Sequence, residues 1–456
     1  MKRLLAILLL LPLFIHAQVW VPVGNPGFTA GQTQYPSMAV TGGRISAGRT
    51  TTAAPGTIYV AYEDFANGAK ASVMKYDGSS WVYAGNPGFS ADTVGFTQIA
   101  VDAGGTPYVV YEDAALNGGA ATVMKLDSSG WVNVGHPGFS AGQINWAGIA
   151  IDSSGLPYVV YSDFSLGGRV VVMRYNGSNW VNVGAPGFSS GEALYEAIVI
   201  APDGTPYLSM GDGGYSTYAR VMKFNGSSWV DVGIPAFSAG SVGWTSIAID
   251  AGGTVYTAYS DASLGLNAVV MKFNSSSWVS VGTPGFSSSD FVQYTSMAIA
   301  PNGTPYVVYE NGDGFATAKK FNGSDWVNAG NPDFSAGAAG GTAIIIAGGI
   351  PYAVYGDGAY SGKITVMELD ASISAAVPPM NTAASGLSVF PNPTSTSLTI
   401  SATDKVTTIA ISNLLGQTVY SQQHDSPRVQ IDVADLPAGV YFVRINGTDV
   451  RKFMKE

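Results

Sequence analysis

A Trp-Val pair recurs seven times along this chain of 456 residues. The intervals between successive pairs are 61, 50, 49, 49, 49 and 48 residues, and the longer first interval contains an extra segment at 44–55. A regular period of this length is typical of proteins built from repeated units, each of which buries its apolar face against its neighbours. The pairs begin at Trp20, Trp81, Trp131, Trp180, Trp229, Trp278 and Trp326.

Each unit contains four short segments rich in Val, Ile, Tyr and Phe. In one unit they are 229–233, 246–250, 255–261 and 268–274, and Gly-containing turns join several of them. Only 11% of the residues are charged and 46% are hydrophobic, with 58 Gly, as expected for a folded all-β chain with many turns. Four strands in about 50 residues, repeated seven times, predict an all-β, seven-bladed β-propeller over residues 18–370.

The two ends of the repeat region complement each other. The region opens with a single Trp strand at 20–24 and closes with three strands at 343–346, 351–355 and 364–369 that have no Trp. We therefore expect 20–24 to pair with 364–369 and to complete the seventh blade, since a closed ring leaves no unpaired strand edge. The Trp strand is then outermost in every blade.

The composition excludes several kinds of function. The chain has no Cys, which excludes disulfides, thiolate nucleophiles and thiolate metal sites. A net charge of −10 argues against binding to nucleic acid or to anionic lipid. The three His residues are too scattered to predict a His-based metal site.

The first 17 residues have the features of a secretory signal peptide. Lys2 and Arg3 precede an apolar run at 4–15, and Ala17 provides a small residue before the expected cleavage at Gln18. The run is too short to span a membrane as a mature helix. No later stretch reaches 18 apolar residues, so the sequence predicts no membrane span in the mature protein.

A different β-pattern follows the repeats. Residues 371–385 contain two adjacent Pro and lack strand alternation, so we interpret them as a linker. Beyond them, Pro-Asn-Pro at 391–393, Asn-Leu-Leu-Gly-Gln at 413–417, Leu-Pro-Ala-Gly-Val-Tyr-Phe-Val at 436–443 and a Lys-flanked end occur in order.

With these motifs, residues 386–456 resemble the type A C-terminal sorting domain of the type IX, or Por, secretion system. The resemblance implies a small Ig-like β-sandwich that directs its cargo across the outer membrane of a Gram-negative bacterium. It also implies the type IX machinery as a partner, and a protein that is secreted or held at the cell surface.

Comparing the seven units with one another separates positions that all blades share from positions that vary. The Trp of each unit and one loop Phe are the same in every unit, so we assign both to packing between strands and blades. The loop residues are Phe28, Phe89, Phe139, Phe188, Phe237, Phe286 and Phe334.

A polar position ends the second strand of each blade. It holds Asp64, Asp113, Asp163, Asp212, Asp261 and Asp357, with Asn311 in the sixth unit. One interpretation is an Asx turn, in which the side chain accepts backbone N–H groups where the strand ends. The other is a ring of carboxylates that holds sugar hydroxyls or a cation, for which Ca²⁺ is the only candidate cofactor.

An aromatic position of changing type follows the loop Phe by seven or eight residues. It holds Tyr35, Phe96, Trp146, Tyr195, Trp244 and Tyr294, with Gly341 in the last unit. If the Trp strand is outermost, this position lies on the same rim as the polar position. Aromatic faces beside Asp, Gln and Asn suit neutral sugars, while packing between the mouths of the blades is the structural alternative.

The sequence supports three functions. The leading hypothesis is a non-catalytic binding module for glycans or another surface polymer, with the six Asp and six aromatic residues as ligand-binding candidates. The second is a polysaccharide hydrolase or lyase, for which Glu63, Glu112 and Glu310 are the nearest candidates for acid–base residues. The third is a structural surface or adhesion protein without a small ligand.

Overall fold

The computed structural model describes residues 18–41, 56–287, 291–370, 387–413, 418–446 and 449–456. The chain divides into two compact units, Met1–Ser374 and Ala375–Glu456. The signal peptide expected at 1–17, the linker expected at 371–385 and the extra segment at 44–55 lie outside the described residues. In the described part of the chain, no helix is long and apolar enough to cross a membrane.

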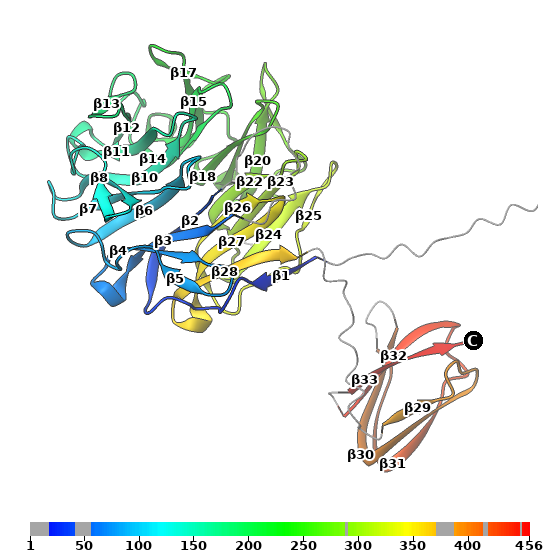
Figure 1. Ribbon diagram of the computed structural model, residues 1–456. Helices are drawn as coiled ribbons and strands as arrows, with labels where there is room; N and C mark the ends of the chain where they lie inside the picture. Colours follow the sequence, from blue (N-terminus) through cyan, green and yellow to red (C-terminus); the bar gives the residue numbers. More distant parts are fainter. Residues whose placement is uncertain (1–17, 42–55, 288–290, 371–386, 414–417, 447–448) are drawn as a thin grey trace, which may run out of the picture. The chain divides into compact units, whose positions relative to one another are not determined.

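Seven four-stranded antiparallel sheets make up the N-terminal unit, one for each repeat, which confirms the predicted propeller. They follow one another in chain order around a ring, from blue to yellow in Figure 1. The first strands of neighbouring blades contact each other all the way round, and β2 of the first blade contacts β26 of the last. The first strands therefore surround the axis, and the Trp strands lie outermost.

Blade 1 consists of β2 (Thr33–Val40), β3 (Ile58–Asp64), β4 (Lys70–Tyr76) and β5 (Trp81–Tyr83). Blade 2 consists of β6 (Val94–Val101), β7 (Pro107–Asp113), β8 (Ala120–Asp127) and β9 (Gly130–Asn133). Blade 3 consists of β10 (Ile144–Ile151), β11 (Pro157–Asp163), β12 (Arg169–Tyr175) and β13 (Trp180–Asn182). Blade 4 consists of β14 (Ala193–Ile200), β15 (Pro206–Asp212), β16 (Tyr218–Phe224) and β17 (Trp229–Asp231).

Blade 5 consists of β18 (Val242–Ile249), β19 (Val255–Asp261), β20 (Asn267–Phe273) and β21 (Trp278–Ser280). Blade 6 consists of β22 (Gln293–Ile299), β23 (Pro305–Glu310), β24 (Ala316–Phe321) and β25 (Trp326–Asn328). Blade 7 consists of β26 (Ala339–Ala347), β27 (Ile350–Asp357), β28 (Lys363–Asp370) and β1 (Val19–Pro22).

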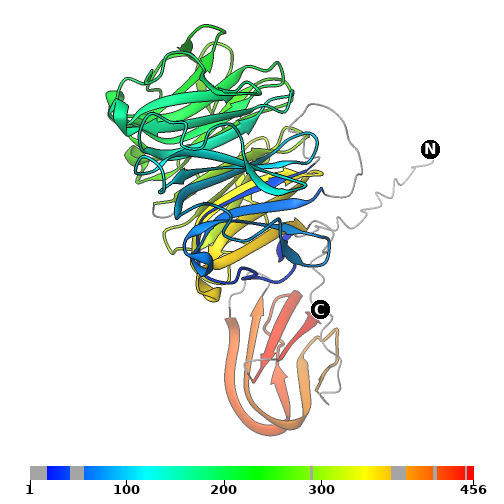
Figure 2. The ribbon, with the colours of Figure 1, turned by 60° about the vertical axis from the view of Figure 1, so that its left-hand side comes forward.

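The ring closes through the ends of the repeat region, as the sequence predicts. Strand β1 pairs antiparallel with β28, and Trp20 lies opposite Leu369. Figures 1 and 2 both show the blue N-terminal strands beside the yellow strands of the last blade. The edge of blade 7 is therefore covered by the start of the same propeller rather than left unpaired.

The middle strands show why the repeats are apolar on both faces. Every residue of β3 is buried, because β3 lies between two neighbouring blades. Val60 and Tyr62 pack against blade 7, whereas Tyr59 and Ala61 pack against blade 2. Alternate residues of a strand point to opposite faces, so both faces must be apolar.

Each repeat Trp joins two blades. Its indole N–H donates a hydrogen bond of 2.6–2.8 Å to a backbone carbonyl of the preceding blade, and its ring stacks on the loop Phe at 4.1–4.9 Å between centroids. Trp20 completes the cycle with a bond to Ala329 O. Both invariant aromatic positions are therefore parts of the scaffold, as predicted.

The C-terminal unit is a separate β-structure, orange to red in Figure 2. It contains β29 (Ser388–Phe390), β30 (Ser397–Asn413), β31 (Thr418–Asp432), β32 (Gly439–Ile445) and β33 (Asp449–Lys455). The long β30 pairs with β31 along most of its length, with β29 near its start and with β32 near its end. Its core includes Ile409, Ile411, Val443 and Phe453. This arrangement suits the expected small sandwich.

Candidate functional site

The six variable aromatic residues all lie at the same irregularity of an innermost strand. In every blade the pairing of the first strand with the second shifts at this residue, which marks a β-bulge. The backbone there has a φ of 48–60° in the six aromatic residues and 69° in Gly341. A bulky residue in this left-handed region is strained, by about 1–3 kcal/mol, whereas Gly is not.

The bulges bring the six rings into one continuous row around the axis. We call this row the aromatic collar: Tyr35, Phe96, Trp146, Tyr195, Trp244 and Tyr294. Neighbouring centroids are 4.7–5.8 Å apart, and neighbouring planes are inclined by 36–56°. Such tilted pairs are a favourable aromatic geometry. Residues about 50 positions apart in the sequence thus form a single surface.

The collar is interrupted at blade 7. Gly341 has the same bulge as the other blades but no side chain, and among the described residues no ring contact joins Tyr294 to Tyr35. These two residues, which flank the interruption, are each 37% exposed, while the four others are half-buried. The collar therefore presents its most accessible aromatic surface on either side of blade 7.

The six aspartates lie at the same end of the blades but inside them. Each is opposite the first residue of the neighbouring inner strand, as Asp64 is opposite Thr33, and each is at most 2% exposed. Five cap a short 3₁₀ helix by accepting the backbone N–H two residues later. The helices are η1 (Phe65–Asn67), η2 (Phe164–Leu166), η3 (Gly213–Tyr215), η4 (Ala262–Leu264) and η5 (Gly358–Tyr360).

Other groups of the same blades also bind these carboxylates. Asp64 accepts a hydrogen bond from the Ser72 hydroxyl at 2.7 Å, and Asp212 forms a 2.8 Å ion pair with the buried Arg220. The caps on the 3₁₀ helices are the backbone contacts of the Asx-turn interpretation, and these side-chain contacts add to them. A ligand role for the aspartates stays a prediction, and the accessible polar groups of this rim belong to other residues.

Three glutamates precede the polar position in blades 1, 2 and 6, and burial raises the pKa of each. The pKa of Glu63 rises to about 7, first through burial and then through the nearby Glu112. The pKa of Glu310 also rises to about 7 through burial. Glu112 accepts a hydrogen bond from Gln143, which moderates its raised pKa.

A fourth carboxyl, Glu196, was not singled out by the sequence. It follows collar residue Tyr195, is buried, and accepts a hydrogen bond from Ser162 of blade 3. Its other oxygen has no hydrogen-bond partner in the structure, and burial raises its pKa to about 8. The signal in the sequence was a Glu where four other blades have Thr.

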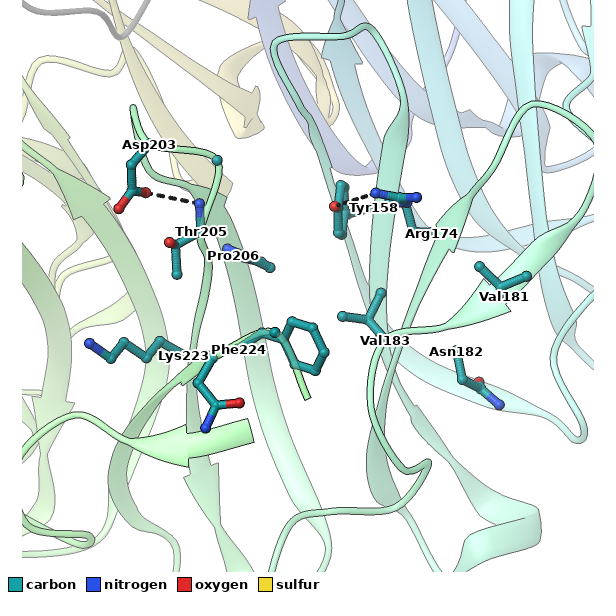
Figure 3. Close-up of a pocket in the computed structure, with 13 residues that line it drawn as sticks. Tyr158, Arg174, Val181, Asn182, Val183, Asp203, Thr205, Pro206, Lys223 and Phe224 are labelled. Carbon is teal, nitrogen blue, oxygen red and sulfur yellow. Dashed lines mark hydrogen bonds between the residues drawn. The ribbon is translucent and has the colours of Figure 1, made fainter. Parts of the chain in front are cut away.

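The opposite rim contains a hollow that the sequence does not predict. A cavity of about 590 Å³ lies between blades 3 and 4 (Figure 3). Tyr158 and Arg174 line one side and are joined by a 3.3 Å hydrogen bond, while Lys223 and Phe224 line the other. The side of the cavity formed by blade 4 includes a tight turn, in which the Asp203 carboxylate accepts a hydrogen bond from Thr205 N–H. The sequence feature that could have indicated this rim is the Lys or Arg that six units carry at the position of Arg174.

No cluster of three or more His, Cys, Asp or Glu residues with metal-binding geometry occurs within the part of the chain that the structure describes. The cation interpretation of the polar position therefore has no ligand set among those residues to support it.

A known protein family matches the C-terminal unit. Residues 388–456 match the family described as the secretion system C-terminal sorting domain. No curated protein matches the chain.

Several solved structures resemble the chain at low identity. PorZ, an essential bacterial surface component of the type-IX secretion system of Porphyromonas gingivalis, is 14% identical with a TM-score of 0.48, over 96% of this chain and 61% of PorZ. The chain thus spans less than two thirds of PorZ. A PL25 ulvan lyase is 14% identical with a TM-score of 0.48, over 76% of this chain and 96% of the lyase.

An α-L-arabinanase of Penicillium chrysogenum is 12% identical with a TM-score of 0.42, over 78% of this chain and 98% of the arabinanase. At such identities these likenesses say nothing about activity. The sorting-domain match does carry a conclusion, because it agrees with the motifs at 391–393 and 436–443. The protein is an all-β propeller whose C-terminal residues 388–456 form a type IX secretion system sorting domain, which implies secretion or attachment to the cell surface.

Proposed function

We propose that this protein is an exported carbohydrate-binding module and that the aromatic collar is its binding surface. The observation that carries the proposal is the strained backbone of the collar. Six bulky residues keep a φ of 48–60°, although blade 7 builds the same bulge with Gly341. Strain retained where an unstrained residue would fit is a feature of functional sites.

The chemistry of the collar suits sugars. Aromatic faces stack on the C–H faces of a pyranose, and side-chain amides exchange hydrogen bonds with its hydroxyls. Gln34, Asn145 and Gln293 immediately precede collar residues and are exposed or half-buried. The type IX sorting domain supports the location, since an exported protein meets polysaccharides outside the cell.

A glycan array probed with the purified protein tests this proposal, followed by calorimetry on the strongest hit. Replacing a collar residue by Gly, as in blade 7, removes the ring without adding strain. Trp146→Gly and Trp244→Gly should each lower affinity several-fold, since one stacked ring contributes about 1 kcal/mol. Their melting temperatures should stay near that of the parent, unlike Trp229→Ala, which empties a scaffold position. Failure of the parent protein to bind any glycan would refute the proposal.

The raised pKa values of Glu63 and Glu310 favour a second candidate, a polysaccharide hydrolase or lyase. A carboxyl group with a pKa near 7 can donate or accept a proton at neutral pH. Release of oligosaccharides from a panel of neutral and uronate polysaccharides tests this candidate. Glu63→Gln and Glu310→Gln should abolish such release if the two groups act as acid and base, and intact polymers would count against catalysis.

A further inference from the structure

On the collar rim, blade 7 lacks three side chains that its neighbours, blades 1 and 6, carry. Gly341 replaces the collar ring, and Gly340 precedes it where blades 1 and 6 have Gln34 and Gln293. Gly356 stands where blades 1 and 6 have Glu63 and Glu310. A Cβ on Gly340 would meet no atom within 4 Å, so the space in front of it is open. We call this region the blade-7 notch.

The floor of the notch is closed by Pro36. A Cβ on Gly341 would lie 2.9 Å from the Pro36 Cδ, which is closer than real Cβ contacts. An aromatic residue at 341 would therefore require Pro36 to shift, whereas the space above Gly340 is free. The open space thus lies on the exposed side of Gly340, next to the position of the missing collar ring.

Tyr294 and Tyr35 form the two walls of the notch. They are the exposed members of the collar, because each lacks a neighbouring ring on the side of blade 7. Burial raises the pKa of Tyr35, and the nearby Glu63 and then Tyr294 add to the rise. In every other blade a protein ring occupies this position of the collar.

A carboxyl group without a hydrogen-bond partner lies beside the notch. Glu310 is on the face of β23 that packs against blade 7, because Tyr306 and Val308 of the same face contact Ile344. Glu63 instead lies on the face of β3 that packs against blade 2, with Tyr59 and Ala61. In the described structure the Glu310 carboxyl group forms no hydrogen bond with another side chain or with the backbone. Buried polar groups normally have partners, so hydrogen-bonding capacity is left over at this part of the rim.

We propose that the blade-7 notch is the principal binding subsite of the collar and that it takes one uncharged pyranose ring in place of the missing seventh ring. This inference rests on the proposed glycan-binding function. Tyr35 and Tyr294 would contact the apolar faces of the sugar, and Glu310 would exchange hydrogen bonds with its hydroxyls. An uncharged sugar fits because the Glu310 carboxyl group lies at the site and the chain carries a net charge of −10, both of which disfavour a uronate.

The test compares ring removal beside the notch with ring removal elsewhere. Calorimetry at pH 8, where Glu310 with its pKa of about 7 is ionised, would use cellohexaose, mannohexaose and xylohexaose as uncharged probes and an oligogalacturonate as the anionic probe. Tyr35→Gly and Tyr294→Gly should lower affinity for the bound uncharged probe at least ten-fold, against several-fold for Trp146→Gly. Melting temperatures near that of the parent show that the fold survives.

A second variant fills the notch without touching the collar. Gly340→Gln introduces the residue that blades 1 and 6 carry at this place, and it should also lower affinity at least ten-fold. The matched control, Leu194→Gln, makes the same side chain at the same place in blade 4 and should change affinity less than two-fold.

The outcomes distinguish this inference from the proposed function. Three results would refute the notch as the principal subsite while leaving the collar as a glycan-binding surface. They are unchanged binding by Gly340→Gln, equal losses of affinity in Tyr35→Gly and Trp146→Gly, and preference for the oligogalacturonate. If neither the array nor these probes detect binding by the parent protein, the proposed function fails and the notch fails with it.

Discussion

Closure of the ring by β1 should make Trp20 one of the most important single side chains for the stability of the propeller. Trp20 is 6% exposed, stacks on Phe334 with centroids 4.5 Å apart, and donates a 2.7 Å hydrogen bond to Ala329 O. Truncating a buried Trp to Ala costs about 3–5 kcal/mol. The buried Ala329 carbonyl would also lose its donor, which adds about 1 kcal/mol or more.

We therefore expect Trp20→Ala to lower the free energy of unfolding of the propeller by about 4–6 kcal/mol. Trp20→Phe keeps part of the stacked surface but loses the hydrogen bond, so it should cost less. Equilibrium denaturation followed by tryptophan fluorescence isolates this transition, because all nine Trp residues lie between positions 20 and 326, outside the sorting domain. The C-terminal unit is then silent in the measurement.

The comparison with Trp229→Ala makes the reasoning refutable. Trp229 occupies the same position in the middle of the ring and is 8% exposed, so its truncation should cost a similar amount. Deletion of residues 18–24 should cost more than Trp20→Ala, since it also removes the pairing with β28 and exposes a strand edge. If Trp20→Ala or the deletion is nearly neutral while Trp229→Ala is severe, β1 does not close the ring.

Three further predictions concern other parts of the chain. Burial raises the pKa of Glu196 to about 8 in the folded protein, above its unfolded value of about 4.5. The protonated group therefore stabilises the fold at low pH. This stabilisation is lost as the pH rises toward 8, by up to about 1.4 kcal/mol per pH unit. Glu196→Gln should therefore gain stability relative to the parent between pH 5 and 8 in urea titrations, while the exposed control Glu192→Gln should not. Gly330→Ala should be more destabilising than Gly78→Ala in the same assay: both glycines have positive φ, but only at Gly330 would a Cβ press on Trp20, at 2.8 Å. Intact mass spectrometry of exported protein should find an N-terminus at Gln18 and loss of the sorting domain, and deletion of residues 386–456 should leave the propeller folded but not exported; a full-length cytoplasmic protein would contradict both assignments.

The sequence was sufficient for the architecture because the seven units can be compared within one chain. A residue such as Trp229, repeated in every unit, indicates an interaction that all blades share. In the structure this interaction is a hydrogen bond from the indole to the preceding blade and a ring stack on the loop Phe. The single strand at one end and three at the other also predict the closure by β1. The sorting domain was recognisable from local motifs, since it does not depend on the propeller.

The candidate site depended much more on tertiary structure. The sequence located the aromatic and acidic positions on one rim, but residues such as Tyr35 and Phe96 are 61 positions apart, and only the closed ring places their centroids 4.9 Å from each other. It could not show that the aspartates turn inward, because an Asx cap and an exposed ligand have the same residue in the same place. Nor could it find the notch, which exists because three glycines of blade 7, unremarkable in a chain with 58 of them, meet at one break in the collar. Repetition determined the scaffold, whereas the site arises where one blade departs from the others, and such a departure acquires meaning only through its neighbours in space.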